Sequence, residues 1–163
     1  MNLDGRTQAL LAEMSTTMPA LAGIGVECLE LRADTVRLTA PLARNQNDKQ
    51  TAFAGSLSAL GMLCGWALTQ RVAMEHALHA QCAIYDVHTR FRQPVRTELI
   101  AHTRCELSDR RALIDALARA GKARWTLDIE VGSSDLPDAV RLSATYAAWV
   151  TGLTPLQETS APA

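Results

Sequence analysis

The sequence predicts an α+β fold in which an antiparallel sheet wraps around one long, buried helix. The first observation behind this prediction is a central stretch without charge, since no charged residue occurs between Lys49 and Arg71. Its apolar residues go all round when the stretch is drawn as a helix, which indicates burial on every side. The second observation is that apolar and polar residues alternate in six other segments, as in a sheet with one covered face. A sheet whose apolar face packs on the central helix buries the apolar residues of the helix and of the strands.

A helix and a strand hairpin are predicted before the central stretch. Two strand-like segments, 25–31 and 36–40, are joined by a turn near Asp34. The segment before them has no basic region followed by an apolar core, so it lacks the pattern of a signal peptide. It is an amphipathic helix instead, because apolar residues recur in it at helical spacing. These residues are Leu10, Leu11, Met14 and Met18.

A membrane span is the alternative for the central stretch, which has about the length that a bilayer requires. Small and polar residues within it and the strands on both sides argue against lipid, so we expect a helix buried in protein. Gly61 and Gly65 lie four residues apart and present a bare backbone face to the sheet. A glycine costs about 1 kcal/mol in a helix interior, and close packing against the sheet explains why both are tolerated.

Four more strands and a short helix are predicted after the central helix. We expect the first two strands to pair as a hairpin that turns near Pro94. The segment "SDRRALIDALARAG" begins with Ser108 as a plausible cap and closes on Gly121, which favours a helix, with an irregular connection as the alternative. The four strand segments are 83–95, 98–107, 124–131 and 140–150.

The length of 163 residues suits one domain, which we place at residues 1–151, followed by a C-terminal tail at 152–163. The 16 basic and 17 acidic residues give a net charge of -1, which favours neither a nucleic-acid surface nor a polybasic membrane patch. Four cysteines without CxxC or zinc-ligand spacing indicate buried thiols, no metal site and a reducing, cytoplasmic location. They are Cys28, Cys64, Cys82 and Cys105.

The segments "APLARNQNDKQTAFAGSLSALGMLCGW" and "VHTRFRQPV" resemble the thioesterase-like C-terminal domain of the YiiD family. Members of that family show an Asn-rich loop, a Thr-x-Phe-x-Gly-Ser helix start, a Gly-Trp farther along and a strand ending in Pro-Val. The resemblance covers about residues 40 to 95. It implies the hotdog fold and a homodimer, or a dimer of such dimers, whose sheets join edge to edge around acyl-thioester sites. The segment "YDVHTRF" has the β-branched and aromatic character to pair with its own copy.

The beginning of the central helix is the predicted place for a thioester carbonyl. Backbone N–H groups of Ala54, Gly55 and Ser56 would point free at the loop, and the helix dipole adds positive charge there. We assign these residues and Phe53 to substrate binding. The structural alternative is that Gly55 relieves crowding between helix and sheet while Ser56 caps the helix.

The polar loop before this helix supplies the candidates for managing water. Asp48 is the carboxylate nearest in sequence to the helix start and is our candidate general base, although a solvated turn residue is the commoner role. Asn45 and Asn47 could orient water or the thioester oxygen through their amides. Asparagine also favours turns, so a purely local role is the alternative.

His88, Arg90 and Arg92 share one face of a predicted strand by alternation. In the dimer that the resemblance implies, His88 could reach the loop of the partner and take part in catalysis. Arg90 and Arg92, like Lys122 and Arg124, are candidates for the phosphates of coenzyme A or of a phosphopantetheine arm, which arrive as part of the substrate. A solvated strand face is the alternative for each of them.

Met62, with Leu63 and Trp66, could contact the acyl chain, core packing being the alternative. Other hotdog thioesterases commonly carry an acidic residue on the central helix, where this chain offers Gly61 and Met62. The sequence therefore leaves two functions open. The first is hydrolysis of an acyl-CoA or acyl-carrier thioester, and the second is a non-catalytic module that binds acyl thioesters. No redox cofactor is expected in either case.

Overall fold

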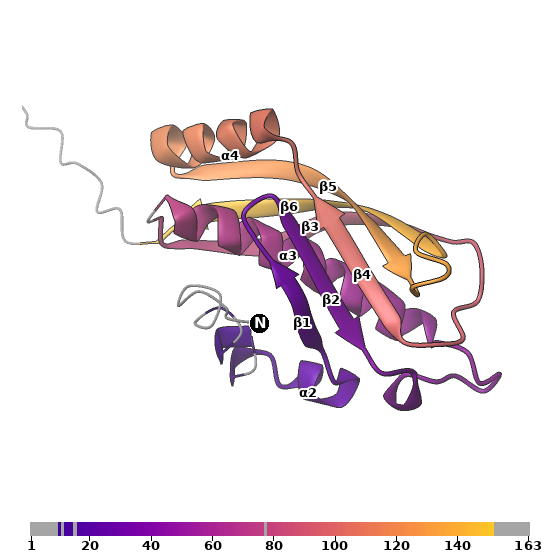
Figure 1. The fold of residues 1–163 in the computed structure, drawn as a ribbon. Helices are drawn as coiled ribbons and strands as arrows, with labels where there is room; N and C mark the ends of the chain where they lie inside the picture. Colours follow the sequence, from indigo (N-terminus) through magenta and orange to yellow (C-terminus); the bar gives the residue numbers. More distant parts are fainter. Residues whose placement is uncertain (1–9, 11, 15, 77, 152–163) are drawn as a thin grey trace, which may run out of the picture.

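The computed structural model describes residues 10, 12–14, 16–76 and 78–151, and a six-stranded antiparallel sheet curves around helix α3 in it (Figure 1). The predicted tail at 152–163 and the first nine residues lie outside the described part. Leu10 and Met14 are buried in the core, and the described residues around them are helical, as predicted. The elements are α2 (Ala20–Ile24), β1 (Glu27–Leu31), β2 (Thr35–Ala40), η1 (Leu42–Arg44), α3 (Ala54–Glu75), β3 (Ala80–Phe91), β4 (Leu99–Arg104), α4 (Leu107–Ala120), β5 (Lys122–Gly132) and β6 (Val140–Val150).

The strand order is β1-β2-β4-β5-β6-β3, so β1 and β3 are the two edges. The predicted hairpin of β1 and β2 is confirmed. The predicted hairpin of β3 and β4 is wrong, because β3 pairs with β6 while β4 lies between β2 and β5. Alternation shows which residues share a face but not which strand is the neighbour. The segment between β3 and β4 therefore crosses from one edge of the sheet to its middle. It is anchored by the buried Val95, whose carbonyl accepts a hydrogen bond from the N–H of Ala52 at 2.8 Å.

The burial of α3 against the sheet is confirmed, and two glycines make it possible. A Cβ added at Gly61 would lie 2.9 Å from a methyl group of Leu142, and one at Gly65 would lie 2.3 Å from Oη of Tyr146. The backbone of α3 therefore approaches β6 more closely than any side chain would allow. None of the helices in the described part of the chain combines the length and apolar character that a membrane span requires.

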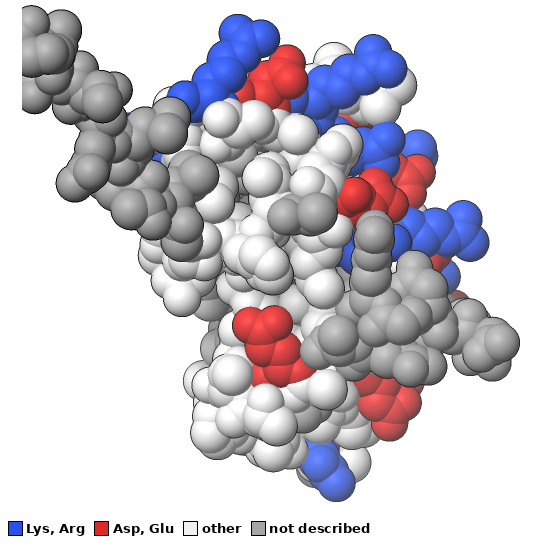
Figure 2. Space-filling model, turned by 90° about the vertical axis from the view of Figure 1, so that its left-hand side faces the viewer, with Lys and Arg blue, Asp and Glu red and all other residues white. Residues whose placement is uncertain are grey.

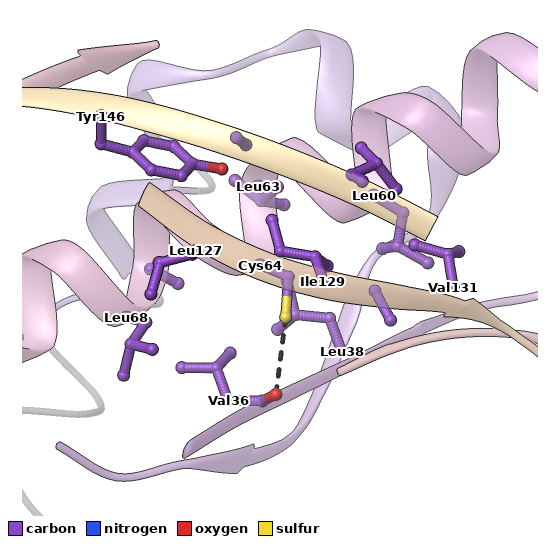
Figure 3. Packing of buried hydrophobic residues seen from close by; sticks show 14 of the residues in the cluster. Val36, Leu38, Leu60, Leu63, Cys64, Leu68, Leu127, Ile129, Val131 and Tyr146 are labelled. Atoms are coloured by element: carbon purple, nitrogen blue, oxygen red, sulfur yellow. Dashed lines mark hydrogen bonds between the residues drawn. The ribbon is translucent and has the colours of Figure 1, made fainter. Parts of the chain in front are cut away.

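The core lies between α3 and the concave face of the sheet, where leucine, isoleucine and valine side chains interlock (Figure 3). The thiol of Cys64 points at the carbonyl of Val36, 3.5 Å away. Burial raises the pKa of Cys64 and raises that of Cys105 to about 11, so both thiols stay protonated at neutral pH. Cys28 and Cys82 are only partly buried, and all four cysteines are free.

The helix predicted before Gly121 is present as α4, which lies beside β5 (Figure 1) and ends at Gly121 in the left-handed region. Ser108 does not cap it, because the helix begins at Leu107 and its cap position, Glu106, makes no side-chain capping bond. Seen from the end where β6 and α3 finish, charged side chains gather near α4 at the top and along the right side (Figure 2). Both signs are mixed there, and the middle of this face is largely uncharged.

Candidate functional site

The loop before α3 is anchored by Asn45, whose side chain is 2% exposed. Its side-chain Nδ2 donates to the carbonyl oxygens of Ile24 at 2.9 Å and Pro41 at 2.8 Å. Its backbone carbonyl accepts a hydrogen bond from the N–H of Phe53 at 2.7 Å. Its Oδ1 has no partner within the described part of the chain. Asn45 therefore joins three segments, and both of its amide protons are used inside the protein. A catalytic part for Asn45 stays a prediction.

Asn47 closes the tight turn that follows. Its Oδ1 accepts the N–H groups of Lys49 and Thr51, and its Nδ2 donates to the hydroxyl of Thr51 at 2.9 Å. The turn includes Gln50 at a φ of 59°, in the left-handed region. This is the local role of a turn asparagine. Its backbone and side chain nevertheless reach the surface beside α3.

Asp48, the predicted base, lies at the tip of this turn with its side chain 77% exposed. Its carboxylate accepts hydrogen bonds from Nζ of Lys49 at 2.9 and 3.0 Å. No buried partner in the described part of the chain holds it over the helix start. Whether it acts as a base stays a prediction.

The first turn of α3 presents free donors, as predicted. Phe53 is the cap residue, it makes no capping bond, and no acidic side chain occupies the first turn. The N–H groups of Ala54, Gly55 and Ser56 precede the first intrahelical bond, which Leu57 donates to the carbonyl of Phe53. The positive end of the helix dipole therefore lies at donors that no carboxylate of the first turn neutralises.

The two structural alternatives for this turn are wrong. Ser56 is the third residue of α3 and does not cap it. A Cβ added at Gly55 would lie 2.3 Å from the ring of Phe53. The glycine therefore leaves room for the Phe53 ring and does not relieve crowding against the sheet. The ring of Phe53, itself half exposed, thus lies back on the first turn of the helix.

An open groove of about 300 Å³ lies between this turn and the end of β3. It brings together three of the predicted site residues, Asn47, Ala54 and Arg92. The structure does not bring Asp48 or His88 to it. The groove is lined by Asn47, Ala52, Ala54, Leu57, Phe91, Arg92, Gln93 and Pro94.

Arg92 is held at the groove by Asp138, whose carboxylate accepts hydrogen bonds from Arg92 and, at 2.9 Å, from Arg141. These bonds, that from Arg141 first, hold the pKa of Asp138 below its usual range. The groove therefore has a fixed guanidinium at one side and uncapped helix donors at the other. Sequence reasoning missed Asp138, because 46 residues separate it from Arg92 and nothing in the local pattern links them.

His88 and Arg90 face away from α3. They pair with Ser143 and Arg141, which lie on the outer face of the sheet, whereas the neighbouring Thr89 pairs with the buried Leu142. The prediction that His88 and Arg90 share a face is consistent with this register. The third residue predicted on that face, Arg92, follows the end of β3 and lines the groove instead, so its part of the prediction is wrong. Within one chain, however, that face is opposite to the groove.

On α3, Met62 and Trp66 are partly exposed whereas Leu63 is buried in the core. The carbonyl of Met62 also accepts a hydrogen bond from Oη of Tyr146 at 2.7 Å. Met62 and Trp66 mark the side of α3 that the sheet leaves uncovered, so of the three predicted chain contacts only these two remain accessible.

Comparison with protein families matches residues 7–149 to a model described as "Putative thioesterase (yiiD_Cterm)". The chain belongs to this family. Residues 7–149 include every strand of the sheet except the last residue of β6, Val150, so the family match extends well beyond the 40–95 segment that carried the resemblance.

Solved structures agree on the hotdog fold of this YiiD-type chain. A "putative thioesterase" from Shewanella oneidensis shares 21% identity and a TM-score of 0.80, over 90% of this chain and 99% of that one. A Pseudomonas aeruginosa protein of unknown function, termed "probable thioesterase", shares 23% identity and a TM-score of 0.77, over 92% and 98%. A protein of unknown function from Chlorobaculum tepidum TLS shares 25% identity and a TM-score of 0.81, over 88% and 93%.

Proposed function

We propose that this protein hydrolyses acyl thioesters carried by coenzyme A or by an acyl carrier protein. The observation that carries the proposal is the groove at the start of α3, where uncapped N–H groups face a fixed arginine. A thioester carbonyl placed at Ala54 and Gly55 gains hydrogen bonds that strengthen as its oxygen becomes negative. Water adds to the carbonyl carbon, the C–S bond breaks, and a carboxylic acid and a thiol leave.

Arg92 has the position to bind the anionic part of the carrier. Its guanidinium already donates to Asp138 and keeps further donors for a phosphate oxygen. Arg90 is our second candidate for this role on the outer face, together with Lys122 and Arg124. The nearby Phe53 and Ser56 complete the proposed substrate contacts at the helix start.

A second copy of the chain is part of the proposal, because β3 is an exposed edge with an apolar inner face. Ile84, Val87 and Phe91 pair with buried residues of β6 and so face the α3 side, yet they are 39%, 37% and 50% exposed. An apolar edge strand of this length invites pairing with another strand. A homodimer joined along β3 covers these side chains, and it keeps His88 of both copies on the outer face of the continuous sheet, because edge-to-edge pairing preserves the faces. Light scattering should give at least twice 17.6 kDa.

Binding without hydrolysis is the second candidate function, and the position of Asp48 favours it. Its carboxylate is exposed and paired with Lys49, and the amides of Asn45 and Asn47 are engaged within the loop. A groove with donors but no base would hold a thioester without cleaving it. The chain would then serve as an acyl-thioester sensor.

A thiol-release assay with acyl-CoA substrates of increasing chain length separates the two functions. We expect turnover, and Asp48→Asn decides whether Asp48 is the base. Loss of a general base lowers kcat by about a hundredfold or more with an unchanged melting temperature, whereas an unchanged kcat would make Asp48 a solvated loop residue. Asn47→Ala should have a smaller effect. Asp135→Asn, in another exposed turn, is the matched control and should keep the parental rate. Binding of acyl-CoA without any thiol release would instead establish the non-catalytic module.

A further inference from the structure

A second hollow lies away from the groove at α3. It has a volume of about 580 Å³ and is formed by α2, the start of β1 and the turn around η1. It shares no lining residue with the groove. Most of its lining is apolar, and Arg44 and Glu27 are its charged members. The lining residues are Met14, Leu21, Ala22, Gly25, Val26, Glu27, Cys28, Pro41 and Arg44.

Hydrogen bonds within the protein hold the walls of this hollow in place, so the hollow is formed before any ligand binds. The buried Asn45 donates to the carbonyls of Ile24 and Pro41, which ties the end of α2 to the strand exit after β2. One amide thus sets the spacing of the two walls. A hollow that is already formed binds without the cost of ordering its walls.

Gly25 gives Arg44 its place at the hollow. Gly25 has a φ of +72°, and an added Cβ would lie 3.0 Å from Cδ and 3.1 Å from Nη1 of Arg44. The guanidinium therefore lies across a bare backbone, where Nη1 donates to the carbonyl of Ala22 at 3.3 Å. This is the only hydrogen bond recorded for the Arg44 side chain among the described residues, so its other N–H groups remain available.

A mostly apolar hollow of several hundred Å³ with one available guanidinium suits a ligand that has an alkyl chain and an anionic end. Glu27 also lines the hollow, so the site has no net positive charge and would not attract phosphates in general. A ligand gains from Arg44 only when its apolar part fills the hollow and its anion meets the guanidinium. Binding of this kind selects an amphipathic monoanion.

We infer that this hollow binds an unbranched fatty carboxylate, with the alkyl chain between α2 and β1 and the carboxylate on Arg44. The inference does not need the proposed hydrolysis. The two are compatible, because a fatty carboxylate is the acid that thioester hydrolysis releases. The site would let the protein respond to accumulated acid at a distance from the groove.

Calorimetric titration with decanoate, and with decanol as the uncharged analogue, tests this inference without any thioester present. We expect one decanoate per chain and about fourfold tighter binding for each CH₂ added from hexanoate onward until the hollow is full. Arg44→Ala should weaken decanoate about tenfold, as for loss of a charged hydrogen bond at a partly exposed site. The same variant should leave decanol binding unchanged.

Two further variants keep the test decisive. Arg111→Ala removes an exposed arginine of α4 and should bind decanoate like the parent. Ala22→Trp fills the hollow and should abolish binding of both ligands while the melting temperature stays near that of the parent. No decanoate binding at millimolar concentration, or equal affinities for Arg44→Ala and Arg111→Ala, would overturn the inference. Thiol release without decanoate binding would support the proposed function and reject this inference. Decanoate binding without thiol release would support this inference and reject the proposed hydrolysis.

Discussion

Replacement of Gly65 by alanine tests the close approach of α3 to the sheet. The new Cβ would lie 2.3 Å from Oη and 2.6 Å from Cζ of Tyr146, which is 1% exposed and cannot move into solvent. Overpacking of this kind costs about 1–3 kcal/mol. Displacing the ring also breaks the hydrogen bond from Tyr146 to the carbonyl of Met62, a loss of about 1 kcal/mol. The better helix propensity of alanine returns about 1 kcal/mol.

These effects leave a destabilisation of about 2 kcal/mol for Gly65→Ala, measured as the free energy of unfolding in urea. Gly23→Ala is the matched control, because an added Cβ there meets nothing within 4 Å, and it should stabilise by up to about 1 kcal/mol. Adding Tyr146→Phe to Gly65→Ala should recover part of the loss, since the nearest clashing atom is gone. If Gly65→Ala and Gly23→Ala unfold at the same urea concentration, α3 does not pack on β6 as described.

Two other predictions follow from the contacts of the site. Met62→Trp should shorten the longest acyl chain that the proposed hydrolase accepts while the melting temperature holds; an unmoved chain preference would make Met62 a packing residue only. By NMR, the pKa of the Asp138 carboxyl should lie below the ordinary value for aspartate, and Arg141→Ala should raise it. Because the folded-state pKa is lowered, the stabilisation by Asp138 is present above about pH 3.9, the unfolded value, and is lost as the pH falls through the lower folded value. A carboxyl that titrates at its ordinary value in both proteins would show that the arginines do not hold it.

The sequence by itself determined which segments are buried and which faces they bury. A stretch without charge from Gln50 to Gln70 cannot stay in water as an apolar cylinder, so its place at the centre followed from composition. Alternation likewise indicated the inward and outward residues within the strands, except where bulges shift the register in β1 and β3. The spacing of Gly61 and Gly65 indicated close packing, which the contacts with Leu142 and Tyr146 confirm.

Only the tertiary structure decided which distant groups meet. Alternating patterns are alike in all strands, so they could not show that β3 pairs with β6 and not with β4. The partner of Arg92 is 46 residues away, at Asp138. The hollow beside Arg44 likewise exists because Asn45 ties two separate segments together. Such contacts depend on the paths that the connecting segments take past the ends of α3. The free energy that favours one path comes from packing of the whole core, so a local sequence pattern does not contain it.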